Sequence, residues 1–168
     1  LTGIYYGYEG PYFGRVVFPV FDDGEIVCGT GRTFINREPK YYTFGDVSRY
    51  VYGLEKALRE TQLVITEGVF DSYFVRGGVA IFGKKLSQSQ LFRIVSQIPS
   101  DRPIYVGLDP DARVEALDLC ERLLAFYSDV FLLDVPGEDL ASTRGKADAF
   151  RMDYARVAEW RARCSYLV

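Results

Sequence analysis

The residues best suited to do chemistry in this sequence are carboxylates that directly follow apolar runs. Glu67 follows residues 63–66, and Asp109 and Asp111 follow residues 104–108. Both runs have the length and composition of buried strands. If these strands are neighbours in a parallel sheet, their carboxyl ends bring the three carboxylates to one edge. Three such groups repel one another strongly unless cations lie between them.

The ligand chemistry of this group favours a hard divalent cation. The chain contains no histidine, which excludes a Ser-His-Asp triad, a histidine general base and a Cys/His zinc site. Carboxylate oxygens without imidazole or thiolate suit Mg²⁺ or Mn²⁺. We therefore expect Mg²⁺ or Mn²⁺ as the cofactor, and catalysis that rests on carboxylates, basic side chains, hydroxyls or the metal.

Asp71 is a further candidate, four residues after Glu67. If a helix begins at Gly68, its first turn carries Asp71 back towards the same edge, where it would orient a ligand or a bound water. Gly68 would let the chain turn sharply from strand to helix.

The composition is that of a globular protein with a substantial core. Of 168 residues, 48% are hydrophobic and 26% are charged, which excludes a disordered chain. No apolar run is long enough for a membrane helix, and neither a signal peptide nor a transit peptide is visible. The three cysteines are far apart and indicate buried thiols in a reducing compartment. Because the chain begins with leucine, we expect a fragment of a longer cytoplasmic protein.

Residues 1–61 predict a small β-rich domain. Residues 15–21 and 25–28 predict two strands, and the turn between them, Asp22-Asp23-Gly24, makes them a hairpin. Asp46 is suited to cap a helix whose apolar positions, out to Leu58, follow a 3.6-residue period.

Residues 62–143 predict a second domain in which strands and helices alternate. Strands are expected at 63–66, 79–82, 104–108 and 130–135, and helices at 68–76, from Ser87 and at 113–126. Repeated β-α-β units predict an α/β fold with a mostly parallel four-stranded sheet and helices on both faces. Residues 144–168 predict a basic amphipathic helix or linker from Gly145, with Phe150 and Val157 on one face.

The two carboxylate elements resemble those of the Toprim domain, which primases, topoisomerases and some nucleases share. The segment from Glu67 to Asp71 resembles its Glu-Gly element with the following aspartate, and Asp109-Pro110-Asp111 resembles its Asp-x-Asp element. The resemblance implies a Toprim-like sheet and assigns Glu67, Asp109 and Asp111 as metal ligands.

A collinear series of further motifs resembles the RNA-polymerising core of bacterial and phage DNA primases. It covers roughly residues 15 to 139 and consists of Arg15-Val16-Val17-Phe18-Pro19-Val20, Gly29-Thr30-Gly31-Arg32, Pro39-Lys40-Tyr41, Tyr52-Gly53-Leu54 and Val79-Ala80-Ile81-Phe82-Gly83. The resemblance implies metal-dependent, template-directed synthesis of short RNA primers. It also implies three partners: single-stranded DNA, ribonucleoside triphosphates and a replicative helicase.

Five basic residues are candidates for contacts with nucleic acid or nucleotide. Arg15, Arg32 and Lys40 match family positions that touch template or nucleotide phosphates. Lys84 and Lys85 follow a predicted strand end, and we expect them to contact a triphosphate. Tyrosines such as Tyr41 and Tyr42 (the alternative is core or hairpin packing) would stack on unpaired bases.

The sequence departs from the primase pattern at two positions. Val114 stands where a glycine is usual, and Ala141 stands where a second carboxylate is expected after Asp139. Asp139 is therefore a candidate ligand for an outer metal whose site would be weakened. Two alternatives stay open: a Toprim nuclease or topoisomerase-like cleavage module, and a degenerate module that only binds DNA or a helicase.

Overall fold

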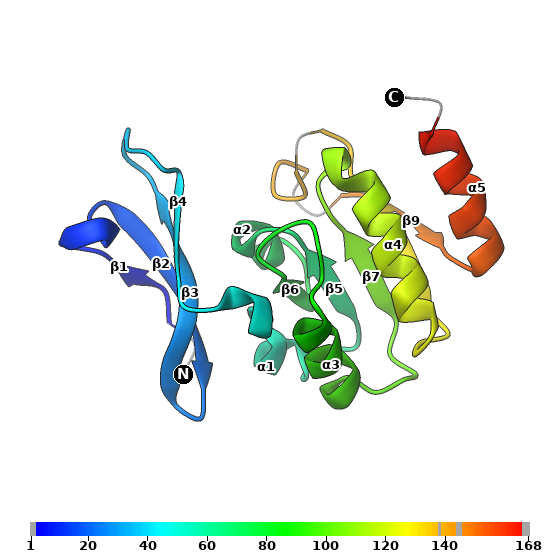
Figure 1. Cartoon of the computed structure of the whole chain (residues 1–168), viewed down its shortest axis with the longest axis horizontal. Coiled ribbons are helices and arrows are strands. Elements are labelled where there is room, and N and C mark those ends of the chain that lie inside the picture. Colours follow the sequence, from blue (N-terminus) through cyan, green and yellow to red (C-terminus); the bar gives the residue numbers. More distant parts are fainter. Residues whose placement is uncertain (1–2, 138, 144–145, 166–168) are drawn as a thin grey trace. The chain divides into compact units, whose positions relative to one another are not determined.

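The chain divides into two compact units, residues 1–50 and 51–168. The computed structural model describes residues 3–137, 139–143 and 146–165 (Figure 1). The sequence predicts that the first domain ends at residue 61. The segment from Val51 belongs with the second unit instead, because Val51, Leu54 and Ala57 are buried in that unit's core.

The first unit is a four-stranded antiparallel sheet in the order β1-β2-β3-β4. Its elements are β1 (Tyr5–Tyr6), β2 (Arg15–Asp22), β3 (Glu25–Thr33) and β4 (Tyr41–Phe44), with single 3₁₀ turns η1 (Gly10–Tyr12) and η2 (Val47–Arg49). The predicted hairpin is confirmed as β2–β3. Asp23 and Gly24 at its tip both have positive φ, 49° and 85°, as a tight two-residue hairpin turn requires.

The second unit is built on a five-stranded sheet in the order β6-β5-β7-β8-β9. Its strands are β5 (Leu63–Thr66), β6 (Gly78–Ala80), β7 (Ile104–Gly107), β8 (Val130–Asp134) and β9 (Asp148–Arg151). The first four are parallel, as expected, and β9 pairs antiparallel with β8 at the edge. The predicted α/β fold is confirmed, and β9 makes the sheet one strand wider than expected.

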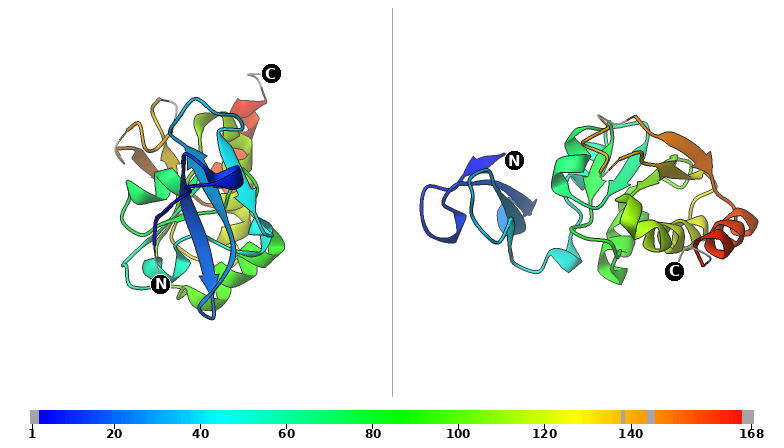
Figure 2. Two further views of the ribbon diagram at one scale, coloured as in Figure 1. Left: turned by 90° about the vertical axis from the view of Figure 1, so that its left-hand side faces the viewer. Right: turned by 90° about the horizontal axis from the view of Figure 1, so that it is seen from above.

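Helices cover this sheet unequally on its two faces. The helical elements are α1 (Leu54–Ala57), α2 (Val69–Tyr73), α3 (Gln88–Gln97), the 3₁₀ turn η3 (Pro110–Ala112), α4 (Arg113–Leu124) and α5 (Tyr154–Cys164). Residues of α1, α3, α4 and α5 pack with alternate strand residues such as Ile65 and Val106 into one large core. The right-hand view of Figure 2 shows α4 and α5 side by side on this face.

The opposite face carries a smaller core. Val64 of β5 packs there with Val135 and Leu140, which follow β8, and with Val75, which follows α2. Among the described residues, every helix is too short or too polar to span a lipid bilayer.

The predicted helix after Asp46 is wrong as a continuous element. Asp46 does cap a turn, since its side chain accepts a hydrogen bond from the Ser48 N–H, but the turn η2 ends at Arg49. Tyr52 then pairs with Ala80 through two backbone hydrogen bonds of 2.9 and 3.1 Å, which extends the edge of β6. A residue paired to a strand cannot also be helical, so the helix restarts only after Gly53, whose φ is 78°.

The predicted C-terminal helix is also wrong over its first part. Asp148–Arg151 form β9, in which Phe150 pairs with Leu132 of β8. The helix α5 begins after Asp153, whose side chain accepts a hydrogen bond from the Arg156 N–H. Gly145, where the helix was expected to start, lies outside the described residues. Pairing with the free edge of β8 satisfies backbone groups that a helix there would have left exposed.

Candidate metal centre

The carboxyl ends of β5 and β7 bring three acidic side chains together. The two strands are parallel neighbours in which Thr66 and Gly107 are paired. Glu67, Asp109 and Asp111 each offer a carboxylate oxygen, and these three oxygens all lie within 4.8 Å of one another. The expected meeting of the three carboxylates at one sheet edge is therefore found.

Thr66 holds the backbone that carries Glu67. Its hydroxyl is fully buried and lies 2.9 Å from the carbonyl oxygen of Val79 and 3.0 Å from that of Gly68. The carbonyl of Glu67 itself accepts a hydrogen bond of 3.2 Å from the Gly83 N–H. The turn after β5 is thus tied to β6 and to the segment that follows β6, which holds the backbone from which the Glu67 side chain extends.

The surroundings of Glu67 and Asp109 disfavour the ionised form of both side chains. Burial, the neighbouring carboxylates of Asp109 and Asp111, and Asp71 raise the pKa of Glu67 to about 7, against the opposing charge of Lys84. Burial and the charges of Asp71, Asp139 and Asp111 raise the pKa of Asp109 to about 6. Both carboxyls would be stabilised in their charged forms by an added cation.

One oxygen of Glu67 is an orphan. Its Oε2 atom is buried and has no hydrogen-bond partner among the residues that the structure describes. A buried carboxylate oxygen without a donor is unfavourable by about 1–3 kcal/mol, so it calls for a partner of another kind. Together with the spacing of the three carboxylates, this atom fits a hard divalent cation held by Glu67, Asp109 and Asp111.

Asp111 is already paired with a cation from the protein. Its Oδ2 lies 2.6 Å from Nζ of Lys84, on the more exposed side of the group. This interaction raises the pKa of the Lys84 ammonium. Of the two adjacent lysines that the sequence singled out, Lys84 is therefore at the carboxylates, while Lys85 is an exposed residue beside it.

Asp71 lies behind the three carboxylates and is 7% exposed. Its Oδ1 accepts a hydrogen bond of 3.0 Å from the backbone N–H of Ala141, which ties α2 to the segment after β8. A side chain at Gly68 would meet Asp71, because a Cβ built there lies 2.8 Å from Oδ2. Gly68 has φ −102°, so a close approach rather than the sharp turn expected from the sequence accounts for glycine here.

The structure leaves Asp139 outside the group of three. Its Oδ1 accepts a hydrogen bond of 2.6 Å from the Ser142 N–H, which closes a local turn. Its charge nevertheless raises the pKa of both Asp71 and Asp109. Ala141 supplies a backbone N–H rather than a carboxylate, and Val114, at the other departure from the pattern, is 57% exposed on α4.

Several solved structures have a fold similar to that of this chain. The structure of the DnaG catalytic core has a TM-score of 0.65 to this chain at 21% identity, covering 93% of this chain and 54% of the other. A DNA primase domain from Pseudomonas aeruginosa gives 0.63 at 25% identity, covering 92% and 51%. The DnaG catalytic domain bound to single-stranded DNA gives 0.63 at 22% identity, covering 79% and 47%.

The chain has the fold of a primase catalytic core. It spans about half the length of the solved primase cores that it matches. No protein-family model matches the sequence, and no curated protein is similar to it in sequence.

In this primase-core fold, Arg15 has a structural role that the sequence did not reveal. It is 1% exposed, and its guanidinium donates hydrogen bonds to the carbonyl oxygens of Pro11, Gly31, Pro39 and Lys40 at 2.6–3.4 Å. A guanidinium committed to four carbonyls inside the first unit presents no surface to a phosphate. The structure does not support the expected contact of Arg15 with phosphates.

Arg32 and Lys40 remain on the surface of the first unit and share one tyrosine. Tyr41 of β4 pairs with Arg32 of β3. The Arg32 guanidinium and the Lys40 ammonium lie 5.6 and 5.8 Å from the centroid of the Tyr41 ring, which is 41% exposed. Tyr42, by contrast, meets Tyr12 edge to face at 5.2 Å. The pairing of an exposed aromatic ring with two cations suits an unpaired nucleic-acid strand.

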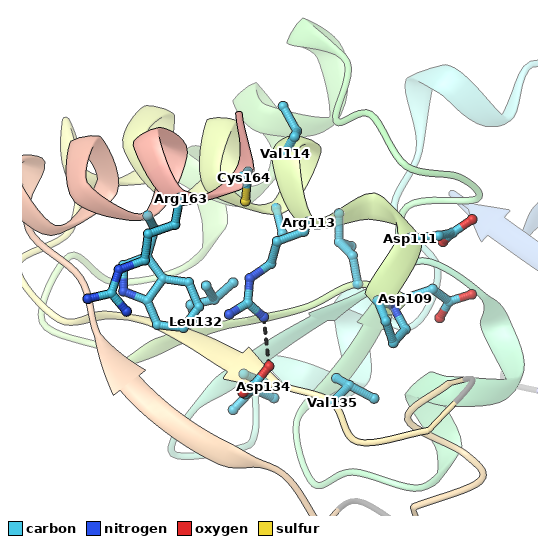
Figure 3. A pocket seen from close by; sticks show the side chains of 14 residues that line it. Asp109, Asp111, Arg113, Val114, Leu132, Asp134, Val135, Arg163 and Cys164 are labelled. Carbon is cyan, nitrogen blue, oxygen red and sulfur yellow. Dashed lines mark hydrogen bonds and ion pairs between the residues drawn. The ribbon is translucent and has the colours of Figure 1, made fainter. Parts of the chain in front are cut away.

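A pocket of about 610 Å³ adjoins the carboxylates and was missed by the sequence analysis. Figure 3 shows Asp109 and Asp111 at one end of it, Arg163 at the other and Arg113 reaching Asp134 between them. Arg113 pairs with Asp134 at 2.8 Å and lies 4.1 Å from the ring centroid of Trp160. Asp134 ends β8, so the rule that found Glu67 and Asp109 would also have indicated it.

Proposed function

We propose that this chain is the catalytic core of a DNA primase that joins ribonucleotides on a single-stranded DNA template. The observation that carries the proposal is the meeting of Glu67, Asp109 and Asp111 within 4.8 Å at the carboxyl edge of a primase-core sheet. The comparisons support the fold, and the orphaned oxygen of Glu67 supports a metal at this edge.

Glu67, Asp109 and Asp111 would hold Mg²⁺ or Mn²⁺. When bound, such an ion lowers the pKa of a ribose 3′-hydroxyl and neutralises charge on the α-phosphate and the leaving pyrophosphate. Asp71 holds the segment after β8 in place by accepting a hydrogen bond from the Ala141 N–H. Asp139 is proposed as a ligand for a second ion. Histidine is absent and Glu67 would be an ionised metal ligand, so the metal and bulk water would have to take up the protons that the reaction releases.

The first unit would bind the template. Arg32, Lys40 and Tyr41 offer two cations and one exposed ring to a single strand, which gives affinity for phosphate and base without sequence recognition. One solved primase core of this fold is bound to single-stranded DNA, and another is the primase fragment of the bacteriophage T7 primase-helicase. A helicase partner is proposed by analogy with the latter.

The direct test is synthesis of labelled RNA on a single-stranded DNA template with ribonucleoside triphosphates and Mn²⁺. The proposal expects short products with the wild-type chain and none with Asp109→Asn. Degradation of the DNA without incorporation would support a nuclease instead.

A second candidate is a module that binds DNA or a helicase without catalysis. It is favoured by Ala141, which offers a backbone N–H to Asp71 where the primase pattern has a second carboxylate. Binding of Mn²⁺ and of single-stranded DNA without any RNA product would support this candidate over the primase.

A further inference from the structure

Lys84 is a single cation facing several carboxylates. Its ammonium lies 2.6 Å from Asp111, and its charge partly opposes the rise in the pKa of Glu67 and of Asp109 that burial and the neighbouring carboxylates cause. The Lys84 side chain is 40% exposed and that of Asp111 is 71% exposed, so the pair lies on the solvent side of the group. The buried Oε2 of Glu67 has no hydrogen-bond partner among the residues that the structure describes. Lys84 therefore balances only the outer part of the negative charge.

The backbone on the N-terminal side of Lys84 is held by hydrogen bonds, while its side chain reaches outward to pair with Asp111. Ile81 donates a hydrogen bond to the carbonyl of Thr66, and Gly83 donates one to the carbonyl of Glu67. The buried Gln90 side chain donates to the carbonyl of Ile81 at 3.0 Å. Beyond these fixed points, the Lys84 ammonium has its ion pair with Asp111. A long flexible stem on an anchored backbone can exchange one anionic partner for another without moving the fold.

A divalent ion and this ammonium compete for the same carboxylates. An ion held by Glu67, Asp109 and Asp111 would lie within a few ångströms of Lys84, where two positive charges repel each other appreciably even through solvent. A nucleotide triphosphate bound at such an ion would bring new anionic oxygens to the same place. The metal ion would then repel the ammonium from Asp111, and the phosphate oxygens would attract it.

We propose that Lys84 is an exchangeable counter-ion: it pairs with Asp111 before metal binds and transfers to the triphosphate of the incoming nucleotide once the metal is in place. This deepens the proposed function and rests on it. Lys84 would weaken the binding of metal alone and strengthen the binding of the metal–nucleotide complex. The two effects have opposite signs, which a purely structural ion pair would not produce.

The test compares wild-type chain with Lys84→Met and Lys84→Arg. Affinity is measured first for Mn²⁺ alone, by calorimetry and by the signal of free Mn²⁺ in electron paramagnetic resonance. It is then measured for a ribonucleoside triphosphate at saturating Mn²⁺. Arg59→Ala is the control, because it removes an exposed cation just before β5, at the opposite edge of the sheet. Thermal unfolding checks that each variant is folded.

Lys84→Met is expected to bind Mn²⁺ about tenfold more tightly and the triphosphate about tenfold more weakly than wild type. Lys84→Arg and Arg59→Ala are expected to stay within about twofold of wild type in both measurements. Unchanged Mn²⁺ affinity in Lys84→Met, or tighter Mn²⁺ binding with unchanged triphosphate affinity, would overturn the proposal. Failure of the wild type to bind Mn²⁺ would overturn it together with the proposed function. If Lys84→Met shows both expected shifts but the wild-type chain makes no RNA, the proposed role of Lys84 is supported. Only the proposal of primer synthesis is then contradicted.

Discussion

Thr66 and Gly107 are paired residues of the parallel strands β5 and β7, and each is the last residue of its strand. The chain therefore leaves both strands at the same level. Glu67 comes one residue later on one side, and Asp109 comes two residues later on the other. This shared level is what turns two separate sequence motifs into one group of carboxylates within 4.8 Å.

The pKa values of Glu67 and Asp109 predict how metal binding and stability depend on pH. Both are raised in the folded chain, to about 7 and about 6 from 4.5 and 3.8, so the folded state binds protons that the unfolded state has lost. These two groups therefore make the metal-free chain less stable as the pH rises from about 5 to about 8. A cation relieves the same repulsion, so added Mn²⁺ should raise the melting temperature more at pH 8 than at pH 5.5.

Thermal unfolding with and without Mn²⁺ at the two pH values checks this. In Glu67→Gln/Asp109→Asn the difference between the two pH values should largely disappear. An equal Mn²⁺ effect at both pH values in the wild type would contradict the assignment of these groups.

Asp71→Ala should weaken metal binding without removing a ligand. The change leaves the Ala141 N–H without its acceptor and frees the segment after β8, at a cost of about 1–3 kcal/mol in unfolding free energy. Asp71→Asn keeps an acceptor oxygen and should retain most of the stability. Chemical denaturation together with Mn²⁺ titration of both variants makes the comparison, and equal behaviour of the two would argue against this positioning role.

Gly68→Ala should disturb the site through a contact rather than through backbone strain. The new Cβ would lie 2.8 Å from Oδ2 of Asp71, so either that carboxylate or the turn carrying Glu67 must shift. We expect Mn²⁺ affinity to fall by about tenfold, as a misplaced ligand would cause. The double variant Gly68→Ala/Asp71→Ala removes the clash, and its Mn²⁺ affinity should match that of Asp71→Ala; a further loss would contradict the explanation.

Arg15 and Arg32 should respond to substitution in opposite ways. Arg15→Ala removes four hydrogen bonds from a buried side chain and should destabilise the first unit by about 2–4 kcal/mol. Arg32→Ala should leave stability within about 0.5 kcal/mol and weaken binding of single-stranded DNA several-fold at low salt. Denaturation curves and fluorescence anisotropy with a labelled oligonucleotide separate the two. Weaker DNA binding by a fully stable Arg15→Ala would restore the original phosphate-contact prediction.

The sequence predicted the parallel strands and the meeting of the carboxylates because both depend on local patterns. Short apolar runs bounded by turn residues mark buried strands, and a carboxylate just after such a run must lie at the sheet edge. Ser87 likewise begins α3 as expected, and the structure adds a reciprocal cap between Ser87 and Gln90. In each case a few consecutive residues carry the information.

The features that the sequence missed depend on partners far along the chain. Tyr52 lies within a segment whose apolar positions follow a helical period, yet its backbone pairs with Ala80. Phe150 fits a helix face, yet it lies in β9 because β8 offers a free edge. Arginine usually lies on the surface, yet Arg15 is buried among four backbone carbonyl oxygens, which include those of Gly31 and Lys40. Tertiary pairing overrides local preference at these positions.

The most direct test of the metal centre is a Mn²⁺ titration of the wild-type chain, Glu67→Gln, Asp109→Asn and Asp101→Asn. Asp101 is an exposed carboxylate in the loop before β7, on the side of the sheet where the parallel strands begin, and it serves as the matched control. We expect saturable Mn²⁺ binding by the wild type and by Asp101→Asn, and at least about tenfold weaker binding by the other two, all with the fold intact. Wild-type affinity in folded Asp109→Asn would contradict this expectation.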